Sequence, residues 1–207
     1  METYTTHKGI DLSHQDGNPD VNLHEALNSG INFCFIKATQ GTWTDPKFVN
    51  RQPRVRETFP VRGFYCFVDS TTGAVEQGNY FAETIGKLET NEYAVFDLED
   101  GGMVLTGSEA VTYVMNMVAA FKAKSGSIDN QIIIYTSIAW AIGQFGEGLS
   151  QFTNWHLWAA RYNSELGSVA PWSAALVWQN SEHGTVPGIG TDTVDLDLWL
   201  DGHWPIV

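Results

Sequence analysis

The chain has 207 residues, with 11 basic and 24 acidic side chains, and its formal net charge at pH 7 is −13. This length suits one well-buried domain better than two. An acidic balance of this size argues against nucleic-acid binding, which needs a basic surface, so we expect no nucleic-acid partner. No apolar stretch approaches the length of a membrane span, and we expect no membrane partner either.

Short apolar runs alternate with helical segments through most of the sequence, and most of these runs are continuous, as in strands buried on both faces. The strands expected are Gly9–Ser13, Asn32–Ala38, Arg62–Val68, Tyr93–Glu99, Gln131–Thr136, His156–Tyr162, Ala175–Gln179 and Thr193–Leu198. Strand–helix alternation predicts a parallel sheet. Eight strands with helices outside predict an α/β fold, an irregular (β/α)-barrel like the TIM barrel.

Helices are expected over Val21–Asn28, from Asp45 as N-cap onward, and over Glu109–Lys124. The last of these has the clearest limits, with Ser108 as its N-cap and Gly126 at its end. The final third differs, because residues 163–174 and 181–192 contain glycine and proline and leave no room for a full crossover helix. We therefore expect loops to join the last strands, with some antiparallel pairing.

Side chains outside the acids give weaker signals. Cys34 and Cys66 each lie in an apolar run and are interpreted as buried free thiols. Lys37, at the end of the second strand, is a candidate ion-pair partner for nearby acids. A cluster of basic residues is interpreted as a solvated helix face rather than an anion site. Its members are Lys47, Arg51, Arg54, Arg56 and Arg62.

Two carboxylates close the fourth strand. Asp97 and Glu99 alternate along it and so share a face, where their charges repel and their pKa values separate. Glycosidases use such a pair, in which one carboxylic acid is protonated and its neighbour is ionised. The alternative is a strand end with solvated acids before the turn at Gly101–Gly102.

The first and last strands add acids to the same rim. Asp11 closes the first strand, while Asp195 and Asp197 share one face of the last. These two strands are neighbours in a closed barrel, so Asp11 and Asp195 should lie close together. Active sites of such barrels lie at the strand ends, and converging acids favour a carboxylate-based hydrolase.

Eight short segments form a specific set through their order along the chain. They are Gly9–Ser13, Phe35–Gly41, Gly63–Phe67, Phe96–Glu99, Ile134–Thr136, Leu157–Tyr162, Val177–Gln179 and Val194–Asp197. In these segments the chain resembles glycoside hydrolase family 25, the Chalaropsis-type lysozymes, and the resemblance covers essentially all 207 residues. The resemblance implies an eight-stranded barrel with an irregular final third. It also implies hydrolysis of the β-1,4 bond between N-acetylmuramic acid and N-acetylglucosamine in peptidoglycan, with net retention.

On this resemblance Glu99 corresponds to the general acid and Asp97 to its partner carboxylate, with Asp11 and Asp195 in support. Asp97 could act as the nucleophile, or it could stabilise an intermediate formed by the sugar's own acetamido group, and the sequence leaves both open. Cys66 is a departure, since family members often carry His there, and it puts a substrate hydrogen bond in doubt. The residues expected to bind substrate are Tyr65, Tyr135, Trp158, Tyr162, Gln179 and Asp197.

No metal or other cofactor is expected, because the six histidines and two cysteines lack metal-ligand spacing. We expect residues 1–207 to form one catalytic domain without a wall-binding module, acting as a monomer on cell-wall peptidoglycan. The first residues carry no recognisable signal peptide, which favours a phage enzyme released at lysis or carried on the virion, or another export route. Two alternatives remain, a chitinase-like glycosidase and a glycan-binding barrel that lacks activity.

Overall fold

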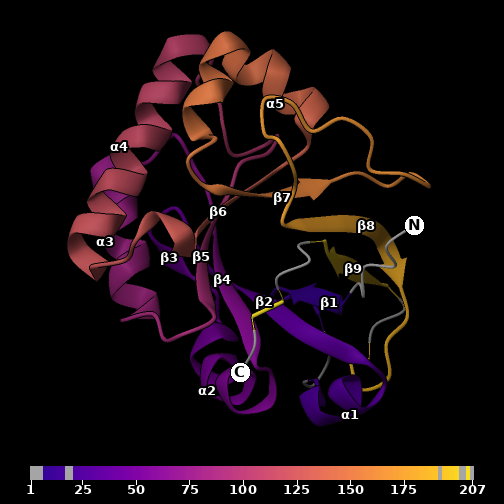
Figure 1. The fold of residues 1–207 in the computed structure, drawn as a ribbon. Helices are drawn as coiled ribbons and strands as arrows, with labels where there is room; N and C mark the ends of the chain where they lie inside the picture. Colours follow the sequence, from indigo (N-terminus) through magenta and orange to yellow (C-terminus); the bar gives the residue numbers. More distant parts are fainter. Residues whose placement is uncertain (1–6, 17–20, 191–192, 201–203, 206–207) are drawn as a thin grey trace.

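The computed structural model of the chain describes residues 7–16, 21–190, 193–200 and 204–205. Within them, one sheet closes on itself into a barrel, with helices packed around part of its outer surface (Figure 1). The strands are β1 (His7–Leu12), β2 (Ile31–Gln40), β3 (Trp43–Thr44), β4 (Val61–Phe67), β5 (Glu92–Asp97), β6 (Ile132–Thr136), β7 (His156–Ala160), β8 (Val177–Gly184) and β9 (Val194–Trp199). The α-helices are α1 (Leu23–Asn28), α2 (Phe48–Thr58), α3 (Ala74–Ile85), α4 (Gly107–Ser125) and α5 (Ile138–Phe145).

The barrel wall consists of eight strands, in the order β1-β9-β8-β7-β6-β5-β4-β2, and the β1–β2 pairing closes it. The two-residue strand β3 pairs antiparallel with the end of β2. Strands β1, β2 and β4 to β8 run parallel to their neighbours. Strand β9 is antiparallel to both β8 and β1. The predicted (β/α)-barrel with an irregular, partly antiparallel final third is therefore confirmed.

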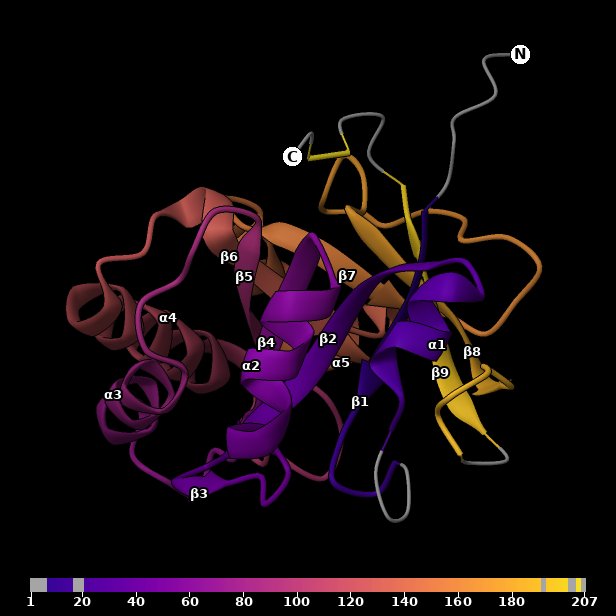
Figure 2. The ribbon, with the colours of Figure 1, turned by 90° about the horizontal axis from the view of Figure 1, so that it is seen from below.

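Helices cover only part of the wall. Figure 1 shows α2, α3, α4 and α5 following one another around the left and top of the barrel, with α1 below, while β8 and β9 on the right carry loops. Figure 2, turned by 90°, shows α3 and α4 on the side away from β8 and β9. Between Ala160 and Val177 the structure has no helix, as the glycine and proline content predicts. No helix among the described residues is long and apolar enough to cross a membrane.

Two apolar layers hold the barrel together. One lies between the strands and the helices, and the other fills the interior of the barrel. The interior cluster includes Phe33, Phe35, Val61, Val95, Ile133, Trp158, Val177 and Trp199. Two glycines make room for its rings, because a Cβ at Gly9 would lie 2.2 Å from the Phe33 ring and one at Gly63 would lie 2.6 Å from the Phe35 ring. Glycine is required at both positions by close approach.

Helix ends agree with the sequence in part. Gly126 ends α4 in the left-handed conformation (φ 74°), as predicted. Ser108 as N-cap is wrong, because the chain is already helical at Gly107 and the extended residue before it, Thr106, is the cap. Asp45 accepts a hydrogen bond from the Lys47 N–H (2.9 Å) in the turn before α2, whose regular part begins at Phe48.

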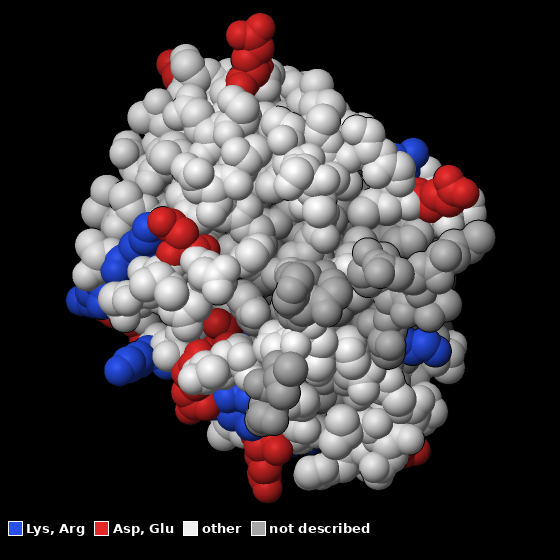
Figure 3. Space-filling model, in the orientation of Figure 1, with Lys and Arg blue, Asp and Glu red and all other residues white. Residues whose placement is uncertain are grey.

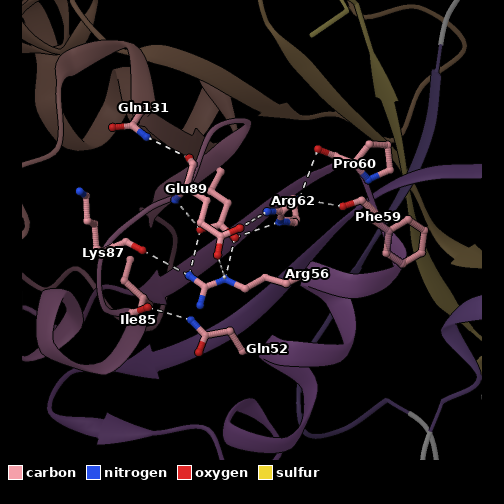
Figure 4. A network of polar contacts seen from close by, with 10 residues as sticks. Gln52, Arg56, Phe59, Pro60, Arg62, Ile85, Lys87, Glu89 and Gln131 are labelled. Atoms are coloured by element: carbon pink, nitrogen blue, oxygen red, sulfur yellow. Dashed lines mark hydrogen bonds and ion pairs between the residues drawn. The ribbon is translucent and has the colours of Figure 1, made fainter. Parts of the chain in front are cut away.

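The basic cluster is not a solvated helix face, and this interpretation is wrong. The Arg51 side chain is buried and its Nη1 donates to the Ser13 carbonyl oxygen (2.5 Å). Arg56 and Arg62 instead enter an ion-pair network with Glu89 and with Glu92, which is fully buried (Figure 4). Because α2 packs against the barrel, its guanidinium groups bind carbonyl and carboxylate oxygens there.

The cysteines are free and buried, as expected. Strands β2 and β4 are neighbours, but their register places Cys34 opposite Arg62 and Cys66 opposite Thr39. Figure 3 shows the face that Figure 1 turns to the viewer, where charged groups are few over the centre and several acidic groups adjoin basic ones. The excess of acid in the chain is thus not gathered on the visible part of this face.

Replacement of Gly9 by alanine tests the interior packing. We expect Gly9→Ala to lower the free energy of unfolding by about 1–3 kcal/mol, because the new methyl group overlaps the Phe33 ring. Gly143→Ala, in α5 with no atom within 4 Å of its Cβ position, is the control and should be neutral or stabilising. Urea denaturation measures the free energy of unfolding of both variants. The double variant Gly9→Ala, Phe33→Leu should be more stable than Gly9→Ala alone, because the smaller side chain leaves room for the methyl group. An unchanged midpoint for Gly9→Ala would contradict the tight packing.

Candidate active site

The acids predicted at the strand ends meet at one mouth of the barrel. Asp11 lies near the end of β1, Asp97 is the last residue of β5, and Glu99 follows two residues later. Asp195 lies near the start of β9, and because β9 is antiparallel it faces the same end, directly opposite Asp11. The mouth is the carboxyl-terminal end of the parallel strands, where barrel enzymes hold their catalytic groups.

A hollow of about 170 Å³, here called the central hollow, lies at this mouth. It is lined by Asp11, Tyr65, Asp97, Glu99, Tyr135, Trp158, Tyr162, Gln179, Glu182 and Asp195. The structure therefore brings together nine of the ten residues predicted from the sequence, all except Asp197, with one addition, Glu182. Closure of the barrel, rather than nearness in sequence, is what assembles them.

Gln179 connects three of these side chains. Its Nε2 donates to Asp11 Oδ2 (2.8 Å), and its Oε1 accepts hydrogen bonds from the hydroxyl groups of Tyr135 (2.8 Å) and Tyr162 (2.7 Å). Gln179 is buried, and its donor and acceptor ends are both engaged by protein. Because an amide oxygen can only accept, both tyrosine protons point to it, and the hydroxyl lone pairs are left to accept from a ligand. Gln179 thus positions its neighbours.

Two other predicted substrate contacts lie deeper. Asp197 is 1% exposed and accepts a hydrogen bond from Trp158 Nε1 (2.8 Å). Trp158 itself is 2% exposed, and its ring centroid lies 4.5 Å from that of Tyr135 and 4.9 Å from that of Phe35. With so little open surface, these side chains shape the floor of the central hollow. Tyr162, at 48% exposed, is by contrast open to a ligand at the rim.

Burial governs the protonation of the acids. Desolvation, then the charge of Glu99, raises the pKa of Asp97 well above its usual range, while Lys37 opposes the rise. Burial likewise raises the pKa of Glu99, with Lys37 again opposing and Asp195 adding to the rise. The pKa of Asp195 is raised to about 6, mainly by burial. Protons are therefore retained here at pH values where exposed carboxyls have lost theirs.

The deeper acids follow the same rule. Burial and the charge of Asp197 raise the pKa of Asp11, and the hydrogen bond from Gln179 partly offsets this. Burial raises the pKa of Asp197 as well, against the hydrogen bond from Trp158. Burial also raises the pKa of Tyr162 to about 12, so this hydroxyl stays protonated near neutral pH. Like charges this close favour shared protons over full ionisation.

Lys37 acts on the acids from a distance. Its Nζ donates to Gln40 Oε1 (2.9 Å) and lies 4.8 Å from the centre of the Phe67 ring. Among the ion pairs of the described residues, Lys37 forms none with the acids of the central hollow. Its positive charge nevertheless offsets part of the rise that burial causes in the pKa values of Asp97 and Glu99.

Larger hollows adjoin the central one on two sides. The first, of about 870 Å³, lies between α5 and the loop after β7 and is here called the lateral hollow. It shares Glu99, Tyr135, Tyr162 and Glu182 with the central hollow. The second, of about 390 Å³, lies beside β1 and shares Asp11, Tyr65, Glu182 and Asp195 with it. The three hollows share lining residues, and together they form a groove across the acids.

Glu182, which lines all three hollows, was missed by sequence reasoning. The strand expected to end at Gln179 continues as β8 to Gly184, through a segment of mixed polar residues without an apolar signal. Its register with β9 shifts between Gln179 and Ser181, and no sequence pattern indicates such an irregularity. Within the described residues, no group of three or more His, Cys, Asp or Glu side chains is arranged to hold a metal ion.

Comparison with known proteins gives the family. Residues 10–189 match the family model of Glycosyl hydrolases family 25. The chain belongs to this family. It is 29% identical over 194 residues to the N,O-diacetylmuramidase of Chalaropsis sp, covering 86% of this chain and 89% of that protein. It is 26% identical over 196 residues to Lysozyme M1 of Streptomyces globisporus, covering 89% of this chain but only 65% of that longer protein.

A solved structure agrees with the family assignment. The bacterial lysozyme from Streptomyces coelicolor superposes with a TM-score of 0.81 at 25% identity, over 93% of this chain and 91% of that one. Membership of family 25 confirms the glycoside hydrolase class, and the superposition confirms the barrel. The acids of the central hollow are therefore best examined as those of a glycoside hydrolase.

Loss of the Gln179 amide should destabilise the site. We expect Gln179→Met to lower the free energy of unfolding by about 1–3 kcal/mol, because buried Tyr135 and Asp11 lose their partner. Tyr162→Phe is the matched control and should change it by less than about 1 kcal/mol, because Tyr135 still donates to Gln179. Chemical denaturation measures both. Equal effects of the two variants would show that Gln179 does not hold the site together.

Proposed function

We propose that this family 25 chain is a muramidase, which hydrolyses the β-1,4 bond between N-acetylmuramic acid and N-acetylglucosamine in peptidoglycan. The observation that carries the proposal is the pair Asp97 and Glu99, which line one hollow within a groove at the barrel mouth. Relatives named lysozyme and N,O-diacetylmuramidase support the same substrate. Residues 10–189, which match the family model, would form the catalytic domain.

Glu99 would act as the general acid. It is half-buried, and its raised pKa lets it hold, to higher pH than an exposed glutamate, the proton that the glycosidic oxygen of the leaving sugar needs. After the leaving group departs, the Glu99 carboxylate would remove a proton from the incoming water. The leaving oxygen would be displaced from the opposite face by the Asp97 carboxylate or the sugar's own acetamido oxygen, and water would then displace that group from the face of Glu99. These two inversions give net retention.

Asp97 would stabilise the reacting sugar. Two roles are possible: attack on the anomeric carbon, or support of an attack by the oxygen of the sugar's own acetamido group. Its surroundings favour the second, because the carboxyl is 6% exposed, its pKa is raised, and no donor among the described residues reaches its Oδ1. A carboxyl with a vacant acceptor oxygen is suited to the acetamido N–H.

Asp11 and Asp195 would support the pair through charge and hydrogen bonding. Asp195 raises the pKa values of Glu99 and Asp11, so it helps both to retain protons. Tyr65, Tyr135 and Tyr162, which line the central hollow, would contact the sugars with ring faces and hydroxyl groups. Trp158, Gln179 and Asp197 would act mainly from beneath, by holding these groups in place.

The proposed partner is bacterial cell-wall peptidoglycan, so the site of action would be the wall, outside the cytoplasm. Release of a phage enzyme at lysis, transport on a virion and secretion are all compatible with this chemistry. A monomer is proposed, since the acids and aromatic residues of the groove come from one chain.

Product analysis with a Glu99 variant tests the proposal. Incubation with purified cell walls should release new reducing ends on muramic acid, detected by reduction with borohydride and mass spectrometry. Glu99→Gln should fold normally and lose at least about 100-fold in rate, because amides donate no proton to the leaving oxygen. Glu109→Gln, on α4 and away from the hollows, should retain full activity.

Other outcomes would identify the alternatives. Release of reducing ends on glucosamine would show that the protein is not a muramidase and would favour the chitinase-like glycosidase. Binding to walls without any release would indicate a glycan-binding barrel that lacks activity. Full activity of Glu99→Gln would remove Glu99 from the role of acid.

The pH–rate profile should respond oppositely to two charge removals. Activity needs protonated Glu99, so it falls as pH rises through the pKa of Glu99. Asp195→Asn removes a negative charge that is present above about pH 6 and should move this fall to lower pH. Lys37→Met removes a positive charge and should move it to higher pH. Profiles of kcat/KM against pH measure both shifts. A shift of the fall in the same direction for Asp195→Asn and Lys37→Met would contradict the roles given to their charges.

A further inference from the structure

The lateral hollow differs in chemistry from the central one. Its lining is mixed, and its aliphatic part comes from two elements: Ile138, Ala139 and Ile142 belong to α5, and Leu166 and Val169 belong to the loop after β7. Ile142 is 55% exposed, so this apolar surface is open. Sugar sites need side-chain hydrogen bonds around hydroxyl groups, whereas small apolar side chains suit methyl and methylene groups.

The groove contains one permanently charged basic side chain among its described lining residues. Among the described residues that line the three hollows, Arg161 is the one Lys or Arg, and it belongs to the lateral hollow. Its Nη1 donates to the Leu166 carbonyl oxygen (2.6 Å), which fixes the side chain against the loop. Its Nε also donates to the Asn163 side-chain oxygen (3.1 Å). In the described part of the chain Arg161 forms no ion pair with a carboxylate, so its remaining N–H groups can bind an anion.

The acids make this position selective. Glu99, Asp100 and Glu182 line the same hollow, so a carboxylate ligand is repelled over most of the groove and attracted only near Arg161. A ligand that fits carries apolar methyl groups and a carboxylate, and it must extend from a glycan bound over Asp97 and Glu99. The peptide attached to the lactyl group of muramic acid has these properties, with alanine methyl groups and free carboxylates.

We propose that the lateral hollow binds the stem peptide of peptidoglycan, with Arg161 pairing with a peptide carboxylate and α5 covering its alanine side chains. This inference rests on the proposed muramidase function and names the part of the substrate that the hollow recognises. It makes the enzyme selective for glycan strands that still carry peptides.

The test compares two forms of one substrate. Uncross-linked glycan strands carrying tetrapeptide stems with free carboxylates are divided, and one half is stripped of peptides by an amidase. Reducing-end release then gives kcat and KM for each. The wild-type protein should show a lower KM for peptide-bearing strands, and Arg161→Gln should raise that KM about twofold to fivefold without changing the KM for stripped strands.

Ile142 supplies variants that leave the Arg161 hydrogen bonds intact. Ile142→Glu should raise the KM for peptide-bearing strands and Ile142→Lys should lower it, because each adds one charge to the same exposed place. Loss of fold would change both in the same direction. Val49→Glu, on α2, carries the same charge at a position 71% exposed and outside the hollows, and should change neither KM.

The outcomes separate the two proposals. No release of muramic reducing ends from either substrate would overturn the proposed function. Release from both, with equal KM changes on peptide-bearing and stripped strands, would leave the muramidase in place and overturn the peptide site, since the hollow would then bind sugar. Opposite effects of the two Ile142 variants on peptide-bearing strands alone would support the peptide site.

Discussion

The closure of the barrel by β9 is the constraint on which the site depends. This strand is hydrogen-bonded in antiparallel register to β1 on one side and to β8 on the other. That register places Asp195 opposite Asp11 and Asp197 opposite both Gly9 and Gln179. A slip of one residue would turn both acids out of the barrel. The carboxylate cluster is therefore a consequence of how the ring closes.

What lies under the acids matters as much as their number. Phe35 and Trp158 fill the barrel directly below the mouth, and Gly63 leaves the space for the Phe35 ring. Packing of this density excludes water from one side of each carboxyl group. Desolvation is accordingly the largest cause of the raised pKa values of Asp97 and Glu99. The apolar interior of the barrel is thus the main reason why these carboxyl groups hold their protons.

Charge organises the groove along its length. Acids line all three hollows, whereas Arg161 stands at the lateral one, between α5 and the loop after β7. A neutral glycan can cross the acidic centre, and an anionic substituent is directed to one side. Basic residues elsewhere, such as Arg56 and Arg62, are engaged by Glu92 and do not compete for this role. In the proposed mode of binding, the cation that pairs with the substrate and the acids that hold protons are therefore separate in space.

The sequence by itself determined the alternation of apolar strands and helices, the irregular final third, the end of α4 at Gly126 and the acids at strand ends. These follow from local periodicity and turn chemistry, which neighbouring residues specify. Tertiary structure alone decided that Asp197 lies beneath the central hollow, that Trp158 lines it with almost no exposed surface, that Glu182 joins it, and that Arg51 is buried. Burial and register depend on partners distant in sequence, such as Asp11 and Gln179, which are 168 positions apart, and no local pattern encodes them.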